Sequence, residues 1–257
     1  MNTPTPAREI DRLIDRLAYA LNTDAPLDEA ALGQAEWQAK KCQRTDPQEA
    51  HLALGMLAGL RQDRAAADQH FQEALRRGWR PMLALNYAAV LHRVYRPEDA
   101  LEQFRQVIQA GPGRYFITAV ERAIQCAYEA GRFHVASELM TLLRRHSDGP
   151  YTAMTNAITA GLPALVQAAD ALALTDEAMA AATDQAWAVI SRLNKRMSVE
   201  IDDFIGDDGA LFLSRTLLLS VPFEEARRMD LALMALQAET DVPLSTFCIS
   251  VRDRPAA

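Results

Sequence analysis

The chain lacks the surplus of positive charge that nucleic-acid-binding proteins usually carry. Among its 257 residues, Lys and Arg number 27 and Asp and Glu number 34, so the formal net charge is −7. The positive residues are also scattered along the sequence rather than gathered into one stripe. Non-specific affinity for nucleic acid comes mainly from concentrated positive charge that neutralises phosphates. We therefore expect a partner that is not a nucleic acid.

Cysteines and long apolar runs are scarce as well. The three cysteines, Cys42, Cys126 and Cys248, are far apart and lack the spacing of metal-ligand pairs. No apolar run reaches the roughly 20 residues that a membrane-spanning helix needs. The first residues, Met1 to Pro6, contain neither the basic nor the apolar region of a secretion signal. These features predict a cytoplasmic protein that does not bind a membrane.

Sequence motifs of the common enzyme classes are also missing. There is no Gly-rich phosphate-binding loop, no nucleophile elbow and no paired metal motif. The five histidines are spread over several segments rather than clustered in the sequence. We therefore expect a protein that is not an enzyme, with no catalytic residues, no metal ligands and no cofactor.

The sequence does contain an internal repeat. Each copy is a trio of residues at positions i, i+4 and i+7, in the order small, large and small-to-medium. Ala67, Phe71 and Ala74 form the first such trio, and it recurs from Ala100 and from Ala136. The starting residues are 33 and 36 positions apart, which brackets the roughly 34 residues of a helix-turn-helix repeat. A small side chain lets two antiparallel helices approach, and the large one fills the space beside it. Each unit is therefore predicted to be a helical hairpin.

Turn residues fall where such hairpins need them. The segments 78–81 and 110–113 separate the units, and Gly111 and Pro112 are typical of a helix end. Over residues 47–145 the pattern resembles the tetratricopeptide repeat family, in which each unit has a small residue and Gly in its first helix, then Ala, an aromatic residue, Ala and a closing Pro. No Trp stands early in any first helix, and Met140 replaces the aromatic residue of the third unit.

The resemblance implies a mainly α fold, namely a solenoid of antiparallel helical hairpins. The sequence around the repeats divides the chain into three parts. Residues 1–46 are predicted to form a capping helical hairpin, because the end unit of a solenoid must cover an exposed apolar surface. Residues 47–174 hold the repeats, with a fourth hairpin expected from helices 151–160 and 163–174 on either side of Gly161.

Residues 175–257 are predicted to form a small α+β module with the order αββαβ. A long helix from Asp176 to Asn194 is followed by two segments of strand character around the turn 206–209. A helix over 222–237 and a strand over 244–252 complete the module. Continued helix through 210–220 is the competing interpretation, since short apolar runs do not separate helix from strand.

In the tetratricopeptide family, the first helix of each unit lines a concave face that binds partners. The resemblance therefore places the candidate partner-binding residues on three first helices. They are Leu52, Met56, Asn86, Ala89, His92, Arg93, Glu121, Arg122, Gln125 and Glu129.

Two features of this set bear on the kind of partner. Some family members grip a peptide carboxylate with five Lys, Arg and Asn residues, of which only Asn86 and Arg122 have counterparts here. Arg122 could still donate to a carboxylate or an amide, although an ordinary solvated Arg is the alternative. Leu52 and Met56 suggest a partner helix or strand with apolar anchors, unless the amino-terminal hairpin covers them as core.

The function predicted from these features is a non-enzymatic scaffold, adaptor or chaperone-like protein that binds a peptide or helix of a protein partner in its repeat groove. The C-terminal module is a candidate surface for a homodimer. One alternative is an immunity or antitoxin-like protein that neutralises a basic effector, which the charge of −7 favours. Another is a metal-dependent enzyme with an acidic site at Asp202, Asp203, Asp207 and Asp208.

Overall fold

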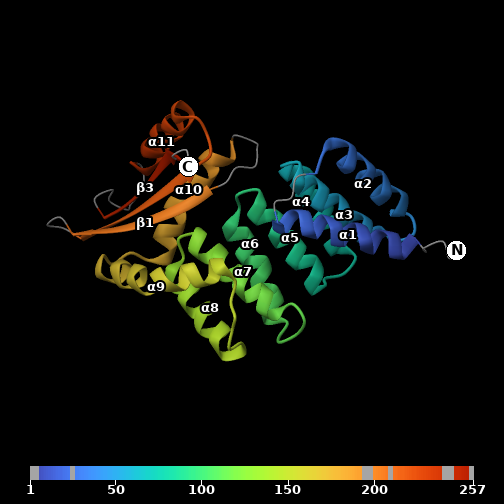
Figure 1. The fold of residues 1–257 in the computed structure, drawn as a ribbon, viewed down its shortest axis with the longest axis horizontal. Helices are drawn as coiled ribbons and strands as arrows, with labels where there is room; N and C mark the ends of the chain where they lie inside the picture. The colour runs from blue at the N-terminus through green and yellow to red at the C-terminus, as the bar shows by residue number, and fades with distance from the viewer. Residues whose placement is uncertain (1–5, 24–26, 193–198, 208–210, 239–245, 255–257) are drawn as a thin grey trace. The chain divides into compact units, whose positions relative to one another are not determined.

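The protein is mainly helical, with a small three-stranded sheet near its C-terminus (Figure 1). A computed structural model describes all residues except 1–5, 24–26, 193–198, 208–210, 239–245 and 255–257. Both the predominance of α-helix and the small α+β part at the C-terminus are as predicted from the sequence.

The first two helices are α1, Pro6–Thr23, and α2, Glu29–Cys42. Asp28 begins α2 as its N-cap, because its carboxylate accepts a hydrogen bond of 2.7 Å from the backbone amide of Ala31. Both helices pack against α3, Pro47–Leu60. The apolar face of α1, which includes Ile10, Leu13 and Leu17, is buried in these contacts.

The repeat region consists of consecutive helices joined by short turns. After α3 come α4, Arg64–Arg76; α5, Pro81–Arg93; α6, Pro97–Gln109; α7, Phe116–Glu129; and α8, Phe133–His146. The residues of all three trios are buried, and Phe71 and Phe104 are 0% and 2% exposed. The trio that marks the repeat in the sequence is therefore a packing motif in each of the helices α4, α6 and α8.

A left-handed residue recurs in the turn inside each repeat. Gln62, Tyr95 and Gly131 have φ angles of 60°, 62° and 78°, and they are 33 and 36 positions apart, like the trios. In the first and third turns, the amide of the following residue bonds back to the helix carbonyl five residues earlier, Asp63 to Ala58 and Arg132 to Ala127. Such a bond closes the C-terminus of the first helix. Because two of these residues are not glycine, sequence inspection finds only Gly131.

The fourth hairpin predicted within residues 151–174 is wrong, because one helix, α9, runs from Ala153 to Ala171 through Gly161 and Pro163. Its buried residues Ile158, Leu162 and Leu165 have helical spacing across that pair. Packing of this continuous apolar face against α8 and the sheet outweighs the helix-breaking tendency of Pro163. At the end of α9, Ala173 has φ 53°, and the Leu174 amide bonds to the Ala169 carbonyl.

The C-terminal part follows the predicted αββαβ order. It comprises α10, Asp176–Ser191; β1, Val199–Asp207; β2, Leu211–Leu219; α11, Phe223–Gln237; and β3, Phe247–Asp253. β1 is antiparallel to β2, with Asp203 opposite Arg215, and β3 is parallel to β2. Residues 211–219 are a strand, so the competing helical interpretation of this segment is wrong. The turn expected at 206–209 lies partly outside the described residues.

Helix α11 protects the outer edge of β3. The side-chain amide of Gln237 donates to the Ile249 carbonyl at 2.9 Å, and its oxygen accepts from the Ile249 amide at 3.3 Å. The Asp230 carboxylate accepts from the Val251 amide at 2.8 Å. Backbone groups that an edge strand would otherwise leave to solvent are thus satisfied by side chains of the neighbouring helix.

The chain divides into two compact units. The first contains residues 1–94 and 102–116, and the second contains residues 95–101 and 117–257. The division does not coincide with the boundaries expected at residues 46 and 174, and those boundaries stay predictions. Among the described helices, none is by itself long and apolar enough to cross a membrane; α9 and α10 meet the length and composition criteria only as a pair bent by 111°.

Candidate functional site

The expected partner-binding residues of α3 lie in the core of the first unit. Leu52 and Met56 are both 0% exposed, and α1, α2, α4 and α5 all pack against α3. Their side chains therefore present no surface to a partner. Of the two interpretations that the sequence left open, this burial agrees with the one in which the amino-terminal hairpin, which packs against α3, covers them as core.

The expected residues of α5 divide into two pairs. Asn86 is buried, and its side-chain amide donates to the Met82 carbonyl at 2.9 Å, one turn earlier on the same helix. Arg93 is buried as well. Ala89 and His92 are half-buried. Since Asn86 and Arg93 are buried, α5 contributes at most Ala89 and His92 to a binding surface.

The expected residues of α7 form a continuous polar row, and all four are half-buried. Arg122 Nη1 donates to Gln125 Oε1 at 3.2 Å, and Gln125 Nε2 donates to Glu129 Oε1 at 2.8 Å. Glu121 Oε1 accepts from the backbone amide of Thr152, just before α9, at 2.8 Å. Spacing of three and four residues places these side chains along one face of the helix. We call Glu121, Arg122, Gln125 and Glu129 the α7 row.

The C-terminus of α7 is held by side chains from the C-terminal part of the chain. The Glu129 carbonyl accepts from Trp187 Nε1 of α10 at 3.1 Å and from Arg215 Nη1 of β2 at 3.3 Å. Arg215 Nη1 also donates to the Tyr128 carbonyl at 2.9 Å. The last carbonyls of a helix have no partner within it. These side chains therefore complete the hydrogen bonding of α7 and fix the end of the α7 row.

Arg215 is fully buried and is held by both charge and aromatic rings. Its Nε and Nη2 atoms donate to the two carboxylate oxygens of Asp203, at 2.8 and 3.0 Å. The guanidinium carbon lies 5.0 Å from the ring centroids of both Tyr128 and Phe133. Although burial favours the neutral form, Asp203 keeps the pKa of Arg215 above its ordinary value. A paired, fully bonded guanidinium of this kind ties the sheet to α7 and α8.

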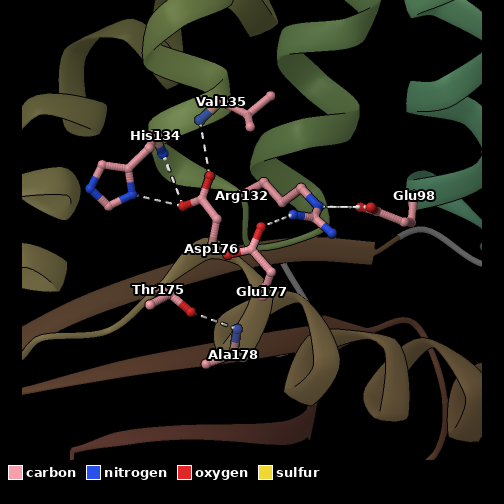
Figure 2. A network of polar contacts seen from close by, with 8 residues as sticks. All are labelled: Glu98, Arg132, His134, Val135, Thr175, Asp176, Glu177 and Ala178. Carbon is pink, nitrogen blue, oxygen red and sulfur yellow. Dashed lines mark hydrogen bonds and ion pairs between the residues drawn. The ribbon is translucent and has the colours of Figure 1, made fainter.

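A second network links α10 to the start of α8 (Figure 2). The side chain of Asp176, the first residue of α10, accepts from the backbone amides of His134 and Val135 at 3.1 and 3.0 Å. The residue before α8, Arg132, makes no side-chain cap of its own. Asp176 thus caps α8 from another helix, and its negative charge also suits the positive end of the helix dipole.

The side chains of His134 and Arg132 extend this network (Figure 2). His134 Nδ1 lies 2.8 Å from Asp176 Oδ1. Hydrogen bonds to Asp176 and to Asp170 raise the pKa of His134 above its ordinary value. Arg132 Nε bonds to the Glu98 carboxylate at 2.7 Å, and its Nη1 bonds to Glu177 at 3.1 Å. Helix α10 is therefore attached to the turn before α8 by several charged groups.

Two further contacts of α10 involve the left-handed turn residues. A Cβ atom added at Gly131 would lie 2.7 Å from Thr183 Oγ1 and 3.2 Å from the Met179 carbonyl oxygen. The rings of Tyr95 and Trp187 stack with centroids 5.9 Å apart. The turn inside the third repeat thus leaves no space for a side chain, because α10 lies directly against it.

Of the acidic residues expected at the metal site, the structure describes the side chains of Asp202 and Asp203, and these two do not converge on one point. Asp203 is paired with buried Arg215, whereas Asp202 is exposed and, as its neighbour on a strand, points to the other face. Asp208 lies outside the described residues. In the described parts of the chain, no group of three or more His, Cys, Asp or Glu side chains could hold a metal ion.

The homodimer expected through the C-terminal module stays a prediction. On β1, Glu200 and Asp202 are both exposed, and Glu200 pairs with Arg254 at 3.0 Å.

Sequence reasoning missed Asp176, Trp187 and Arg215, which hold the ends of α7 and α8. Thr175, whose hydroxyl accepts from the Ala178 amide at 3.2 Å, is a recognisable N-cap and marks the start of α10. Nothing in the sequence indicates that Asp176 caps a different helix or that Arg215 is buried, because both depend on long-range packing.

Comparison with known proteins adds no relative. No family model, no curated protein and no solved structure matches this chain.

Proposed function

We propose that this protein is a non-enzymatic scaffold of the tetratricopeptide-like class that binds a peptide or helix of another protein, with the α7 row as its contact surface. The row supports this proposal because four polar side chains lie along one face of a helix, and three of them, Arg122, Gln125 and Glu129, are joined by hydrogen bonds. A surface whose side chains are already ordered loses less conformational entropy when a partner binds.

The hydrogen bonds that hold the C-terminus of α7 favour the same binding role. Its terminal carbonyls bond to Trp187 and Arg215, and α8, the next helix, is capped by Asp176. Contact residues on a rigid element are positioned more accurately than contact residues on a loop. The proposal therefore attributes to the C-terminal part the task of holding α7 in place.

Arg122 is the residue on which the proposal depends most. Arg122 is half-buried, and its guanidinium bonds to Gln125. An Arg in this setting can donate charge-assisted hydrogen bonds to a carboxylate or an amide oxygen of a partner, and such bonds are the stronger kind. Leu52, Met56 and Asn86 have no place in the proposal, because they are buried.

Binding measured with two matched variants tests the proposal. A partner is first captured from the native cell and purified, and its dissociation constant is then measured by calorimetry. Arg122→Ala should weaken binding by about tenfold or more, because a hydrogen bond to a charged group contributes about 1.5–3 kcal/mol. Arg145→Ala, which removes an exposed Arg of α8, should leave the affinity unchanged. Equal affinities of both variants and the unmodified protein would rule out the α7 row.

A further inference from the structure

Two histidines from consecutive helices meet in the first unit. His51 is on α3 and His70 is on α4, and their Nδ1 atoms lie 3.1 Å apart. The ring centroids are 5.3 Å apart, and the ring planes are tilted by 43°. Both residues are half-buried. The pair has no part in the α7 row or in the networks of the second unit.

The separation of the two nitrogens suits a shared metal ion. Two imidazole nitrogens at about 2.0–2.1 Å from one ion are about 2.9 Å apart at a right angle and about 3.4 Å apart at the tetrahedral angle. The observed 3.1 Å lies between these values. The helices already hold the nitrogens at this distance, so a metal ion would require little rearrangement of the backbone.

The charged groups around His70 include Lys40, Glu36 and Asp63. Glu36 pairs with Lys40 and Arg61. Glu73, one turn after His70, is held by Arg76 and Arg77. Asp63 accepts from the Ala66 amide as the N-cap of α4. With Glu36 and Glu73 engaged by cations, a metal ion at the pair would have two protein ligands.

We propose that His51 and His70 form a site for one borderline divalent transition-metal ion, such as Zn²⁺ or Cu²⁺, that joins α3 to α4. Imidazole nitrogen is a ligand that these ions prefer over Mg²⁺ or Ca²⁺. In the present hydrogen bond, one ring carries its proton on Nδ1. On binding, that proton moves to Nε2 through solvent, so both rings stay neutral and both Nδ1 lone pairs face the ion. Water completes the coordination.

Metal titration of the full-length protein tests the site. After treatment with a chelator, ZnCl₂ and CuCl₂ are added separately and binding is followed by calorimetry. One ion per chain should bind, and His51→Gln and His70→Gln should each weaken it by about tenfold or more, because each removes one of two protein ligands. His146→Gln, which removes an exposed histidine of α8, should have no effect.

A second measurement keeps the test valid if a variant folds poorly. In the unmodified protein, Zn²⁺ should shift the imidazole NMR signals of His51 and His70 while those of His146 stay in place. No binding at millimolar Zn²⁺ and Cu²⁺, equal binding by folded His51→Gln and His70→Gln variants, or zinc-induced shifts elsewhere alone would overturn the proposal.

Discussion

At the residue scale, the turns inside the repeats depend on single left-handed positions. Gln62 and Tyr95 adopt this conformation although L-residues with a side chain are strained there. Gly131 differs because it must be glycine for two reasons, namely its positive φ and the closeness of α10. Gly111, at the end of α6, also has a positive φ, of 91°, but has open space around its Cα.

Alanine at these two glycines should therefore have different costs. Gly111→Ala should lower the free energy of unfolding by about 1 kcal/mol, the cost of a left-handed L-residue. Gly131→Ala should lower it by about 2–3 kcal/mol, because its methyl group also overlaps Thr183 and the Met179 carbonyl. Urea unfolding followed by circular dichroism measures both. Equal losses would show that α10 does not lie against this turn.

At the element scale, the sequence predicts helices and strands well where their apolar spacing is regular. The strands 199–207 and 211–219 and the helix 223–237 lie close to their expected places. The split of α9 was predicted wrongly because Gly161 and Pro163 are local signals, whereas the continuous buried face of α9 is a tertiary one. The attachment of β2 to α7 through Arg215 has no local signal at all.

That attachment can be tested by a double-mutant cycle. Arg215→Met should lower the free energy of unfolding by about 3–5 kcal/mol, because it leaves the buried carboxylate of Asp203 without its partner. Asp203→Leu combined with Arg215→Met removes both charges, so the double variant should be more stable than Arg215→Met alone. Urea unfolding of the four proteins gives the coupling energy. Strictly additive losses would contradict the pairing.

At the scale of the whole molecule, the sequence predicts the secondary-structure content and the fold class better than it predicts the partner-binding residues. A mainly helical chain with a small α+β part follows from the repeat and from the alternating residues near the C-terminus. Of the expected binding residues, Leu52, Met56, Asn86 and Arg93 are buried, because helix spacing alone does not reveal which neighbours cover a face. The four predicted residues of the α7 row, in contrast, are all half-buried and therefore partly exposed.

A domain boundary was expected at residue 174 because the sequence changes there from a helical repeat to a mixed α and β pattern. In space, however, Asp176, Trp187 and Arg215 all bond to α7 or α8. Residues 117–174 and residues 175–257 therefore belong to the same unit.

Site-specific photo-cross-linking is the most direct test of the claim that a partner polypeptide lies on α7. Gln125 in the middle of the α7 row is replaced by p-benzoylphenylalanine, and Glu138, an exposed residue of α8, is replaced in a control protein. Irradiation in the native cell should join a discrete partner protein to position 125 and none to position 138. A partner that cross-links at position 138 and not at position 125 would contradict the account.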